Sequence, residues 1–304
     1  MYDIIVVGGG PAGMTAALYA QRNGKKALVI EKTGFGGQIT HSPKVENYPG
    51  TLQMSGNEFA DKTLEQILAQ GAEIEFENVT AVEDLGESKL VLTEEGGRYE
   101  ALAVILATGV KHRMLGLEGE DALVGEGISF CAVCDGDFYA GQTVCVAGGG
   151  NSALQEAILL AEKCREVIVL QDLPRCTGEQ RLQDALFSRP NVRLIADTKI
   201  NRLLTEGGAL KGLEIESRTT GARQAVPCEG LFVAIGLIPE NEPFKALAEL
   251  NTYGYFDSDE RCETRTPGIY VAGDCRSKGV RQLATAIADG ATAALAACRY
   301  INER

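Results

Sequence analysis

The feature that most limits the possible folds of this chain is an internal repeat. Residues 4 to 31 read IIVVGGGPAGMTAALYAQRNGKKALVIE, and residues 143 to 170 read TVCVAGGGNSALQEAILLAEKCREVIVL. In each copy a β-branched run precedes three glycines. Apolar residues then follow at helical spacing, as in Leu154, Ile158 and Ala161, before a second apolar run. A strand, a glycine turn, a helix and a strand form a βαβ unit of a parallel sheet, so the repeat predicts an α/β fold in which this unit occurs twice.

The segments that follow each copy are expected to complete two domains. Short alternating strands predict a meander packed onto the first sheet, and similar runs follow the second copy. These runs lie at 73–76, 79–82 and 90–93, and at 192–195, 213–217 and 231–235.

The C-terminal part predicts one strand, at 268–274, and one long alanine-rich helix that reaches residue 297. It is too short to form a domain alone, so we expect it to return and complete the first domain. The expectation is a three-layer ββα architecture with a discontinuous first domain, residues 1–112 and 240–304, and an inserted second domain, residues 113–239.

The first glycine loop has the pattern of a dinucleotide site. Gly8 to Gly13 contain G-x-G-x-x-G between a strand and a helix, which lets the backbone turn tightly and approach a pyrophosphate at the helix N-terminus. Glu31 closes the next strand about 20 residues further on, where a carboxylate accepts hydrogen bonds from ribose hydroxyls. The sequence predicts a bound dinucleotide here, and a mere tight turn is the plainer alternative.

The second glycine loop leaves its ligand open. Gly148 to Ala153 read G-x-G-x-x-A in the same context, but Gln171 stands where the first copy has Glu31, with Asp172 next to it. A 2′-phosphate requires an arginine in this place, so NADP is disfavoured. Asp172 leaves NAD possible, and a nucleotide fold that no longer binds a nucleotide is at least as good an interpretation.

Two cysteines, Cys131 and Cys134, form C-x-x-C-D-G just upstream of the second glycine loop. A zinc site needs two further ligands at comparable spacing, and the chain has no second C-x-x-C and only two histidines. We therefore predict no metal. A redox-active disulfide fits better, because C-x-x-C lowers a thiol pKa and closes reversibly, and Asp135 is placed to move the proton of exchange. Two buried structural cysteines are the plainer alternative, and the other seven cysteines are expected to be core or incidental thiols.

Composition excludes several classes of partner and compartment. Lys and Arg number 29 against 42 Asp and Glu, a formal net charge of -13, which argues against nucleic acid because phosphate binding needs a basic face. No apolar run approaches the roughly 20 residues of a membrane helix, and the N-terminus lacks a secretory signal pattern. The nine cysteines are an odd number, which disfavours a secreted disulfide framework. We expect a soluble, cytoplasmic protein with neither nucleic acid nor membrane as a partner.

The two glycine loops, the C-x-x-C-D-G between them and the Gly273-Asp274 pair make the chain resemble the low-molecular-weight thioredoxin reductases over almost its whole length. The resemblance implies FAD as the cofactor, with the first glycine loop and Glu31 on its ADP half. The residues it places around FAD are Gly8, Gly10, Pro11, Ala12, Gly13, Glu31, Gly36, Gly37, Gln38, Asn47, Val79, Ala107, Thr108, Gly109, Gly273, Asp274, Arg281, Gln282 and Leu283.

The resemblance also implies roles for the dithiol. Cys134 would face the flavin, Cys131 would attack the disulfide of thioredoxin, and Asp135 would be the acid and base. A homodimer, and a rotation of the second domain that exposes the dithiol, are further expectations of the family.

The chain departs from the family at the site of the electron donor. Family members bind NADPH with H-R-R-x-x-x-R after the second-domain strand, and here residues 171–177 read QDLPRCT, with Arg175 out of register and Pro174 in the loop. This is similar to the ferredoxin-linked branch of the family. An acidic ferredoxin would need a local basic patch, and 111–113 and 276–281 are the candidate clusters, with solvated surface charge as the plainer alternative.

The sequence thus predicts an FAD-dependent thioredoxin-disulfide reductase with ferredoxin as donor ahead of NADH, and both ahead of NADPH. One alternative is a pyridine-nucleotide-dependent thioredoxin reductase. A second, from another class, is a flavin and disulfide redox sensor or binding module without turnover. A peroxiredoxin-type partner in place of thioredoxin is a further possibility.

Overall fold

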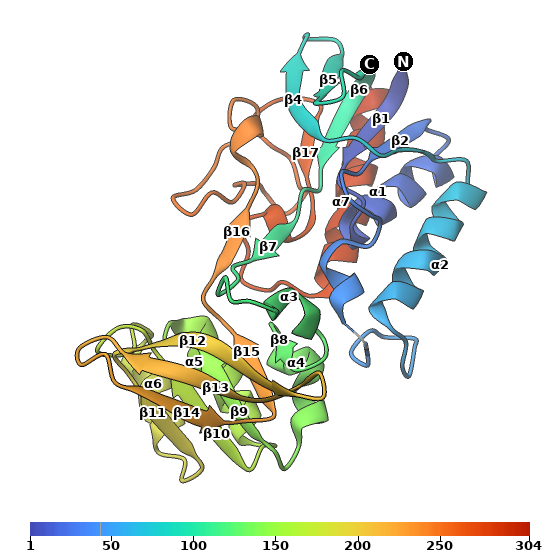
Figure 1. Cartoon of the computed structure of the whole chain (residues 1–304). Helices are drawn as coiled ribbons and strands as arrows, with labels where there is room; N and C mark the ends of the chain where they lie inside the picture. Colours follow the sequence, from blue (N-terminus) through green and yellow to red (C-terminus); the bar gives the residue numbers. More distant parts are fainter. Residues whose placement is uncertain (43) are drawn as a thin grey trace. The chain divides into compact units, whose positions relative to one another are not determined.

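A computed structural model describes residues 1–42 and 44–304 and divides the chain into two compact units (Figure 1). Unit 1 consists of residues 1–111 and 238–304, and unit 2 consists of residues 112–237. The chain therefore leaves unit 1, builds unit 2 and returns. The returning segment supplies a strand and a helix to unit 1.

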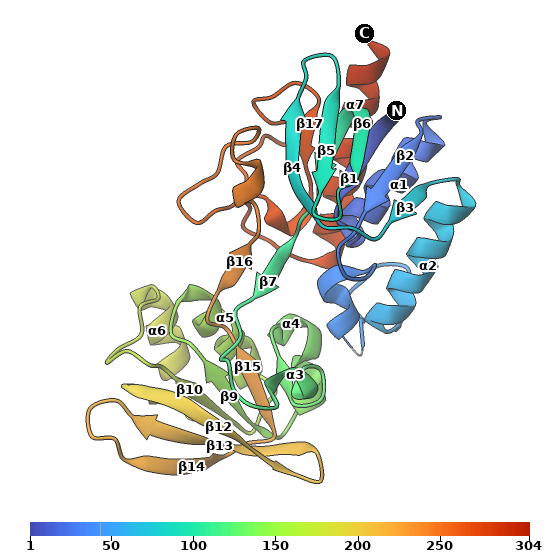
Figure 2. The same cartoon turned by 45° about the horizontal axis from the view of Figure 1, so that its top comes forward.

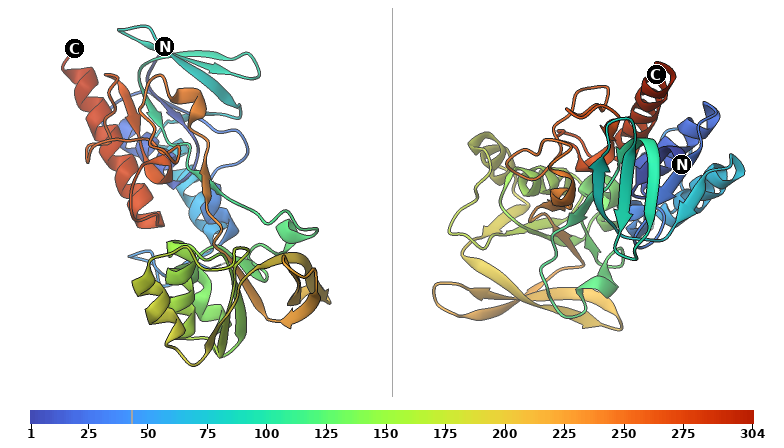
Figure 3. Two further views of the ribbon diagram at one scale, coloured as in Figure 1. Left: turned by 90° about the vertical axis from the view of Figure 1, so that its left-hand side faces the viewer. Right: turned by 90° about the horizontal axis from the view of Figure 1, so that it is seen from above.

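A parallel sheet with helices on one face forms the centre of unit 1. β1 (Tyr2–Val7) pairs with β2 (Ala27–Ile30) and with the long strand β6 (Arg98–Leu106), and the returning strand β17 (Ile269–Val271) pairs with the end of β6. The helices are α1 (Pro11–Arg22), α2 (Gly56–Ala69) and α7 (Leu283–Asn302). In Figure 3, α7 runs beside α1, and Gly290 allows this approach because a Cβ there would overlap the Ala12 carbonyl.

The short strands of unit 1 belong to the same hydrogen-bonded sheet. β4 (Val79–Asp84) and β5 (Lys89–Thr93) are antiparallel, and β5 pairs with the beginning of β6. β3 (Glu73–Glu75) instead extends the parallel sheet beside β2. The expectation that all three strands form one meander on the sheet was therefore wrong for β3, because its short alternating pattern does not reveal which neighbour it pairs with.

Unit 2 repeats the plan in three layers (Figure 2). A parallel sheet has the order β11-β10-β9-β15-β8. Helices α5 and α6 pack on one face, and an antiparallel sheet of order β12-β13-β14 supplies the core on the other. The bounds are β8 Ile128–Ser129, β9 Thr143–Ala147, α5 Asn151–Ala161, β10 Glu166–Leu170, α6 Gln180–Phe187, β11 Val192–Ile195, β12 Thr198–Glu206, β13 Ala209–Ser217, β14 Arg223–Pro227 and β15 Gly230–Val233.

The strands expected after the second copy divide between these two sheets. Residues 192–195 and 230–233 join the parallel sheet as β11 and β15, whereas 209–217 belongs to the antiparallel sheet. β15 is an apolar run that is buried throughout, as strands covered on two faces are, whereas β11 is an edge strand in which Arg193 and Leu194 are exposed.

Short elements connect the larger ones. The two segments that join the units pair as β7 (Val110–His112) and β16 (Leu237–Pro239). The others are η1 Gly37–His41, α3 Glu120–Leu123, α4 Ala132–Asp135, η2 Gly136–Tyr139, η3 Glu242–Phe244 and η4 Gly273–Cys275. Among the described residues, no helix is both long enough and apolar enough to cross a membrane.

Candidate functional site

The first glycine loop connects β1 to α1 through positions where a side chain would not fit. Gly8 has φ +107°, and a Cβ on it would overlap the Ala107 carbonyl. A Cβ on Gly13 would overlap the Gly8 carbonyl, whereas one on Gly10 would meet open space. Gly10 caps α1 without a side-chain hydrogen bond, and Pro11 follows. The helix N-terminus therefore keeps amide groups for an anion.

Glu31 fixes this loop from the end of β2. Its Oε2 accepts a hydrogen bond of 2.7 Å from the Gly9 amide, and its Oε1 accepts hydrogen bonds from the amide and the hydroxyl of Thr33. The residue is 9 % exposed. Two carboxylate oxygens offer about four acceptor positions, so Glu31 can hold the loop and still accept a bond from a ribose hydroxyl.

Three loops meet at the carboxyl ends of parallel strands in unit 1. The segment from Ala107 to Gly109 follows β6 and touches the glycine loop at Gly8. The segment that begins at Gly273 follows β17, and a Cβ on Gly273, whose φ is +83°, would lie 2.8 Å from the Cβ of Ala12. Ligands of open α/β sheets bind at this edge.

The third loop carries a carboxylate with an unused oxygen. Asp274 Oδ1 is buried and accepts no hydrogen bond from the described residues, and Lys278 Nζ lies 3.4 Å away. Burial raises the pKa of this carboxyl, and Lys278 opposes the shift. A buried acceptor without a donor fits a ligand hydroxyl.

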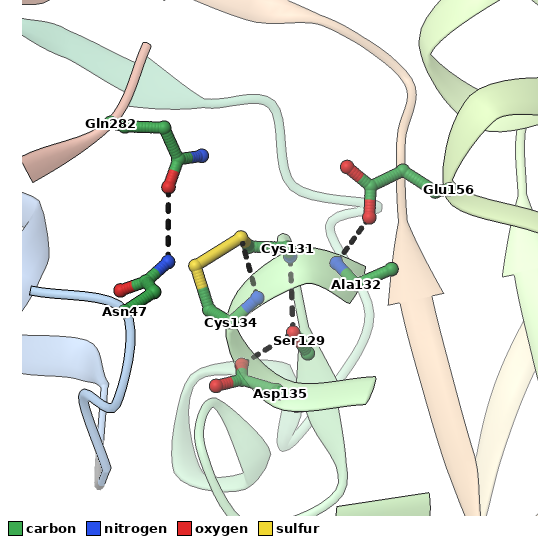
Figure 4. The surroundings of a disulfide bond; sticks show 8 residues. All are labelled: Asn47, Ser129, Cys131, Ala132, Cys134, Asp135, Glu156 and Gln282. Atoms are coloured by element: carbon green, nitrogen blue, oxygen red, sulfur yellow. Dashed lines mark hydrogen bonds between the residues drawn. A yellow bond between two sulfur atoms is a disulfide. The ribbon is translucent and has the colours of Figure 1, made fainter. Parts of the chain in front are cut away.

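The remaining predicted residues around the cofactor lie in unit 1 as well. Asn47 donates a hydrogen bond of 3.2 Å to the side chain of Gln282, the N-cap of α7, and Leu283 is the first residue of that helix (Figure 4). Arg281 donates to the carbonyl of Asp274 and stacks on Tyr255.

Gly36, Gly37 and Gln38 return to the first loop. The Gly36 amide donates 2.9 Å to the Gly9 carbonyl, and Gly37 and Gln38 begin η1. Val79 stands apart from these loops, since it begins β4 and packs against the apolar core of the sheet.

Sequence reasoning missed Asn241, which is fully buried. Its side chain accepts a hydrogen bond of 2.7 Å from the Thr108 hydroxyl and donates to the carbonyls of Gly254 and Cys275. It thereby ties the loop after β6 to the loop after β17. No motif marked it, because its partners are far apart in the sequence.

These features of unit 1 fit a flavin dinucleotide. The uncapped N-terminus of α1, the open space at Gly10, the acceptors of Glu31 and the buried oxygen of Asp274, which has an ion pair with Lys278 but accepts no hydrogen bond from the described residues, supply sites for a pyrophosphate and for hydroxyl groups.

The second glycine loop copies the backbone of the first. Gly148 has φ +122°, and a Cβ on it would lie 2.5 Å from the Ala234 carbonyl, as Gly8 meets Ala107. Gly150 caps α5 without a side-chain hydrogen bond. The Gly149 carbonyl accepts bonds from the amides of Thr177 and Gly178, and the matching bond in unit 1 joins Gly36 to Gly9.

Gln171, which follows β10 as Glu31 follows β2, forms different hydrogen bonds from those of Glu31. Gln171 is 4 % exposed, and its side chain donates 3.3 Å to the Arg175 carbonyl and accepts 3.1 Å from the Asp172 amide. The Asp172 carboxylate forms an exposed ion pair of 3.1 Å with Arg218. Instead of a carboxylate on the glycine loop, this copy has a carboxamide bonded to the loop that follows β10.

Cys131, the N-cap of α4, and Cys134, within this helix, form a disulfide with their Cα atoms 5.3 Å apart (Figure 4). The sulfur of Cys131 accepts a hydrogen bond of 3.1 Å from the Cys134 amide. Both cysteines are partly exposed, and Val133 between them is 52 % exposed. The other seven cysteines are buried and free, which agrees with their expected role as core thiols.

Asp135 is held beneath the disulfide. Its Oδ2 accepts a hydrogen bond of 2.6 Å from the Ser129 hydroxyl, and the Ser129 oxygen accepts one from the Cys131 amide. Asp135 Oδ1 is buried and has no hydrogen-bond partner among the described residues. Burial raises the pKa of Asp135, against the opposing effect of Ser129, so this carboxyl keeps its proton to a higher pH than usual.

A second carboxyl near the disulfide escaped sequence analysis. Glu156 on α5 accepts a hydrogen bond from the Ala132 amide (Figure 4). Burial is the main cause that raises its pKa to about 7. It lies in a helical pattern of otherwise ordinary composition, and only the contact between α4 and α5 reveals it.

The two basic clusters are largely engaged within the chain. The side chains of Arg276 and Lys278 are 11 % and 14 % exposed and both pair with Asp289, so they do not form the surface patch that the sequence suggested. Lys111 pairs with Glu240, while Arg113 is exposed. In the part of the chain that the structure describes, no group of three or more His, Cys, Asp or Glu could hold a metal ion.

Comparison with known proteins gives matches over the whole chain. The family profile described as pyridine nucleotide-disulphide oxidoreductase matches residues 2–290. Thioredoxin reductase of Listeria monocytogenes is 38% identical over 303 residues, which cover 100% of this chain and 95% of the relative. A 34.2 kDa protein in the rubredoxin operon of Clostridium pasteurianum is 38% identical over 301 residues and covers 99% of this chain, with 97% of its own length matched. The crystal structure of thioredoxin reductase from Streptococcus pyogenes has a TM-score of 0.95 and 37% identity, and the match covers 100% of this chain and 99% of that one.

Proposed function

The chain belongs to the pyridine nucleotide-disulphide oxidoreductase family and, within it, to the thioredoxin reductases, which are FAD-dependent oxidoreductases, and from this we propose that it reduces the disulfide of thioredoxin with electrons from ferredoxin. The observation that carries the proposal is the contrast between the two glycine loops. The first retains its carboxylate at Glu31, and the second has Gln171 in that place.

The cofactor residues proposed for unit 1 are those that the resemblance named. The amides at the N-terminus of α1 would hold the pyrophosphate, Glu31 the ribose of the ADP half, and Asp274 a hydroxyl of the ribityl chain. When bound, FAD accepts electrons singly or in pairs and so connects a one-electron donor to a two-electron disulfide.

The chain's own residues perform the disulfide exchange. In the reduced protein, the thiolate of Cys131 attacks one sulfur of the thioredoxin disulfide, which forms a mixed disulfide and releases a thioredoxin thiolate that takes up a proton. Cys134 then attacks the Cys131 sulfur, restores the Cys131–Cys134 bond and releases the second thioredoxin thiol. Asp135 keeps its proton unusually well because it is buried, and it serves as the acid and base of these transfers.

The donor is proposed from the loop after β10. Where the resemblance requires three basic residues for NADPH, this loop has Asp172 in an ion pair with Arg218, followed by an exposed Leu173 and Pro174. A relative in a rubredoxin operon also favours a redox protein as donor. In the cluster at 111–113, two cations would steer an acidic donor. Arg113 is exposed, and Lys111 pairs with Glu240.

The proposal also includes a homodimer and a location in the cytoplasm. A homodimer is expected from the resemblance, and seven free buried thiols suit a reducing compartment such as the cytoplasm. Light scattering of the purified protein would test the first expectation.

An anaerobic titration of the holoenzyme tests the donor. Reduced ferredoxin is expected to bleach the flavin absorbance, whereas stoichiometric NADPH and NADH are expected to leave it nearly unchanged. Bleaching by stoichiometric NADH would overturn the ferredoxin proposal and assign Asp172 to a nucleotide ribose.

A turnover assay tests the acceptor. Sustained reduction of thioredoxin by ferredoxin-reduced enzyme is expected, and its absence would leave a redox sensor without turnover. Cys131→Ser is the matched control, because its flavin should still be bleached while thioredoxin stays oxidised.

A further inference from the structure

A partly buried carboxyl contacts the residue that follows Cys131, and the exchange steps described above give it no role. Glu156 accepts a hydrogen bond from the amide of Ala132, the residue that follows Cys131 (Figure 4). The corresponding residue of the first repeat is Ala16, which is fully buried. A carboxyl in such a position loses hydration, and that cost requires a compensating interaction.

The surroundings of Glu156 are otherwise poor in charge. The elements that pack on α5 contribute apolar side chains to its core, among them Val146 from β9, Val169 from β10 and Leu186 from α6. From α4, the charged group that acts on Glu156 among the described residues is Asp135, which further raises the Glu156 pKa. Tyr139, Cys164 and Cys176 also belong to the cluster that packs on α5, and burial raises the pKa of each, so they stay neutral near pH 7. The groups that change charge near neutral pH are therefore the two carboxyls and, after reduction, the two thiols.

The two carboxyls hold different parts of the C-x-x-C segment. Asp135 follows Cys134 and, through Ser129, is linked to the Cys131 amide. Glu156 comes from another helix and holds the Ala132 amide. Removing either anchor would free one side of a helix that is only four residues long.

We propose that Glu156 is a positioning residue for Cys131, which fixes the start of α4 through the Ala132 amide and takes up the proton that Cys131 loses when it becomes a thiolate. The inference rests on the dithiol exchange proposed above and adds one carboxyl to it. Of the proton transfers given to Asp135 above, Glu156 thus takes the one at Cys131, and Asp135 keeps the one at Cys134.

Protons and electrons balance in the attack of Cys131 on the partner's disulfide. The Cys131 thiol gives its proton to the Glu156 carboxylate, and the resulting thiolate attacks a disulfide of the partner. One S–S bond forms between the proteins and the partner's S–S bond breaks, and the electron pair leaves on the partner's sulfur. That sulfur takes the proton back from Glu156, so the carboxylate is restored.

The test is the pH dependence of Cys131 alkylation in the dithiol form. The holoenzyme is reduced anaerobically with dithiothreitol, freed of it, and reacted with iodoacetamide at pH 5 to 10, with Cys131 followed by peptide mass. On this proposal Glu156 and Cys131 titrate as a coupled pair, so the wild-type profile is expected to show two steps, one of them near the Glu156 pKa of about 7.

Glu156→Gln removes the charge and keeps an oxygen acceptor for the Ala132 amide. The profile is expected to become a single step whose midpoint lies about one pH unit lower than the main wild-type step, which raises the alkylation rate at about pH 8 by up to about tenfold, because at that pH the wild-type Glu156 is charged and opposes the thiolate, and Gln is not. Glu162→Gln is the matched control, since Glu162 ends the same helix, is exposed and pairs with Arg189, and its profile should equal the wild type.

Glu156→Ala tests the positioning role separately. It removes the acceptor too, so amide hydrogen exchange of the peptide around residues 131–135 should accelerate in Glu156→Ala and stay near the wild-type rate in Glu156→Gln. Equal exchange in both variants would overturn the positioning role.

Two outcomes overturn the proton role. One is an unchanged alkylation midpoint in Glu156→Gln, and the other is a wild-type profile with one step at an ordinary thiol pKa of about 8.5. The wild-type measurement decides the matter even where a variant does not fold. Alkylation needs neither thioredoxin nor an electron donor, so a failure of the proposed function in the turnover assay is separate from a failure here.

Discussion

The two glycine loops of this protein share a backbone and differ in the side chains placed around it. Gly8 and Gly148 both have positive φ and both approach a carbonyl of the neighbouring strand's loop. At the end of the next strand, however, Glu31 binds the amide of its glycine loop, while Gln171 binds the loop that follows it. A repeated backbone is therefore weak support for a repeated ligand, because the carboxylate decides what the loop can hold.

The helices after the two loops differ in the same way. α1 buries Ala16 in its core, and α5 has Glu156 at the corresponding place, next to the dithiol segment. At this position the first copy has an apolar side chain in the core. The second copy adds a polar group to the helix where unit 2 carries its chemistry.

The largest expected effect comes from filling the glycine positions. Gly8→Ala and Gly148→Ala each introduce a Cβ at positive φ against a backbone carbonyl, so each should lower the free energy of unfolding by about 2–4 kcal/mol. Only Gly8→Ala is expected to lose its FAD, measured by flavin absorbance after gel filtration.

The Gly148→Ala variant is the control for backbone strain. It should be purified with a full complement of flavin. Equal loss of flavin from both variants would show that unit 2 contributes to FAD binding, and would break the distinction between the two loops.

A reciprocal exchange of the strand-end residues gives the next largest effect. Glu31→Gln should weaken FAD binding about 10- to 100-fold, because a hydrogen bond to a charged group contributes about 1.5–3 kcal/mol. Gln171→Glu should leave FAD affinity unchanged. Fluorescence titration of the apoprotein with FAD measures both, and an unaffected Glu31→Gln variant would remove Glu31 from the proposed site.

The smallest effect concerns stability and pH. The pKa of Glu156 is raised in the folded protein from 4.5 to about 7, so its contribution to stability is full below about pH 4.5 and is lost as the pH rises through 7. Glu156→Gln should remove this loss, so at pH 8 the oxidised variant is expected to be more stable than the wild type, by on the order of 2 kcal/mol.

Urea unfolding at pH 5 and pH 8 measures this difference. Glu162→Gln should follow the wild type at both values, since Glu162 is exposed. A wild-type stability that does not fall between pH 5 and pH 8 would contradict the raised pKa, and with it the contrast between α5 and α1.

Sequence reasoning predicted the local units because each is encoded by neighbouring residues. The strand, glycine turn and helix of both copies are present as expected, as are the C-terminal strand and helix. It could not predict that β3 joins the parallel sheet or that Asn241 links two loops, since these depend on contacts between distant residues.

The predicted basic cluster shows most clearly that a sequence does not reveal contacts between distant residues. The sequence of residues 276–281 predicts a basic cluster. In the structure, however, Arg276 and Lys278 both form ion pairs with Asp289 on α7. A linear sequence shows which charges are near one another along the chain. It does not show which opposite charge a helix will bring to them.

The sequence by itself determined the α/β class, the two glycine loops and the C-x-x-C pair, because steric requirements for glycine and the spacing of two cysteines are local. Only the tertiary structure decided which groups surround them: Gln171 bonded to the Arg175 carbonyl, Asp135 held by Ser129, and Glu156 bonded to the Ala132 amide. The physical reason is that burial and hydrogen bonding, which set the pKa and reactivity of a group, arise from packing between elements that are separate in the chain.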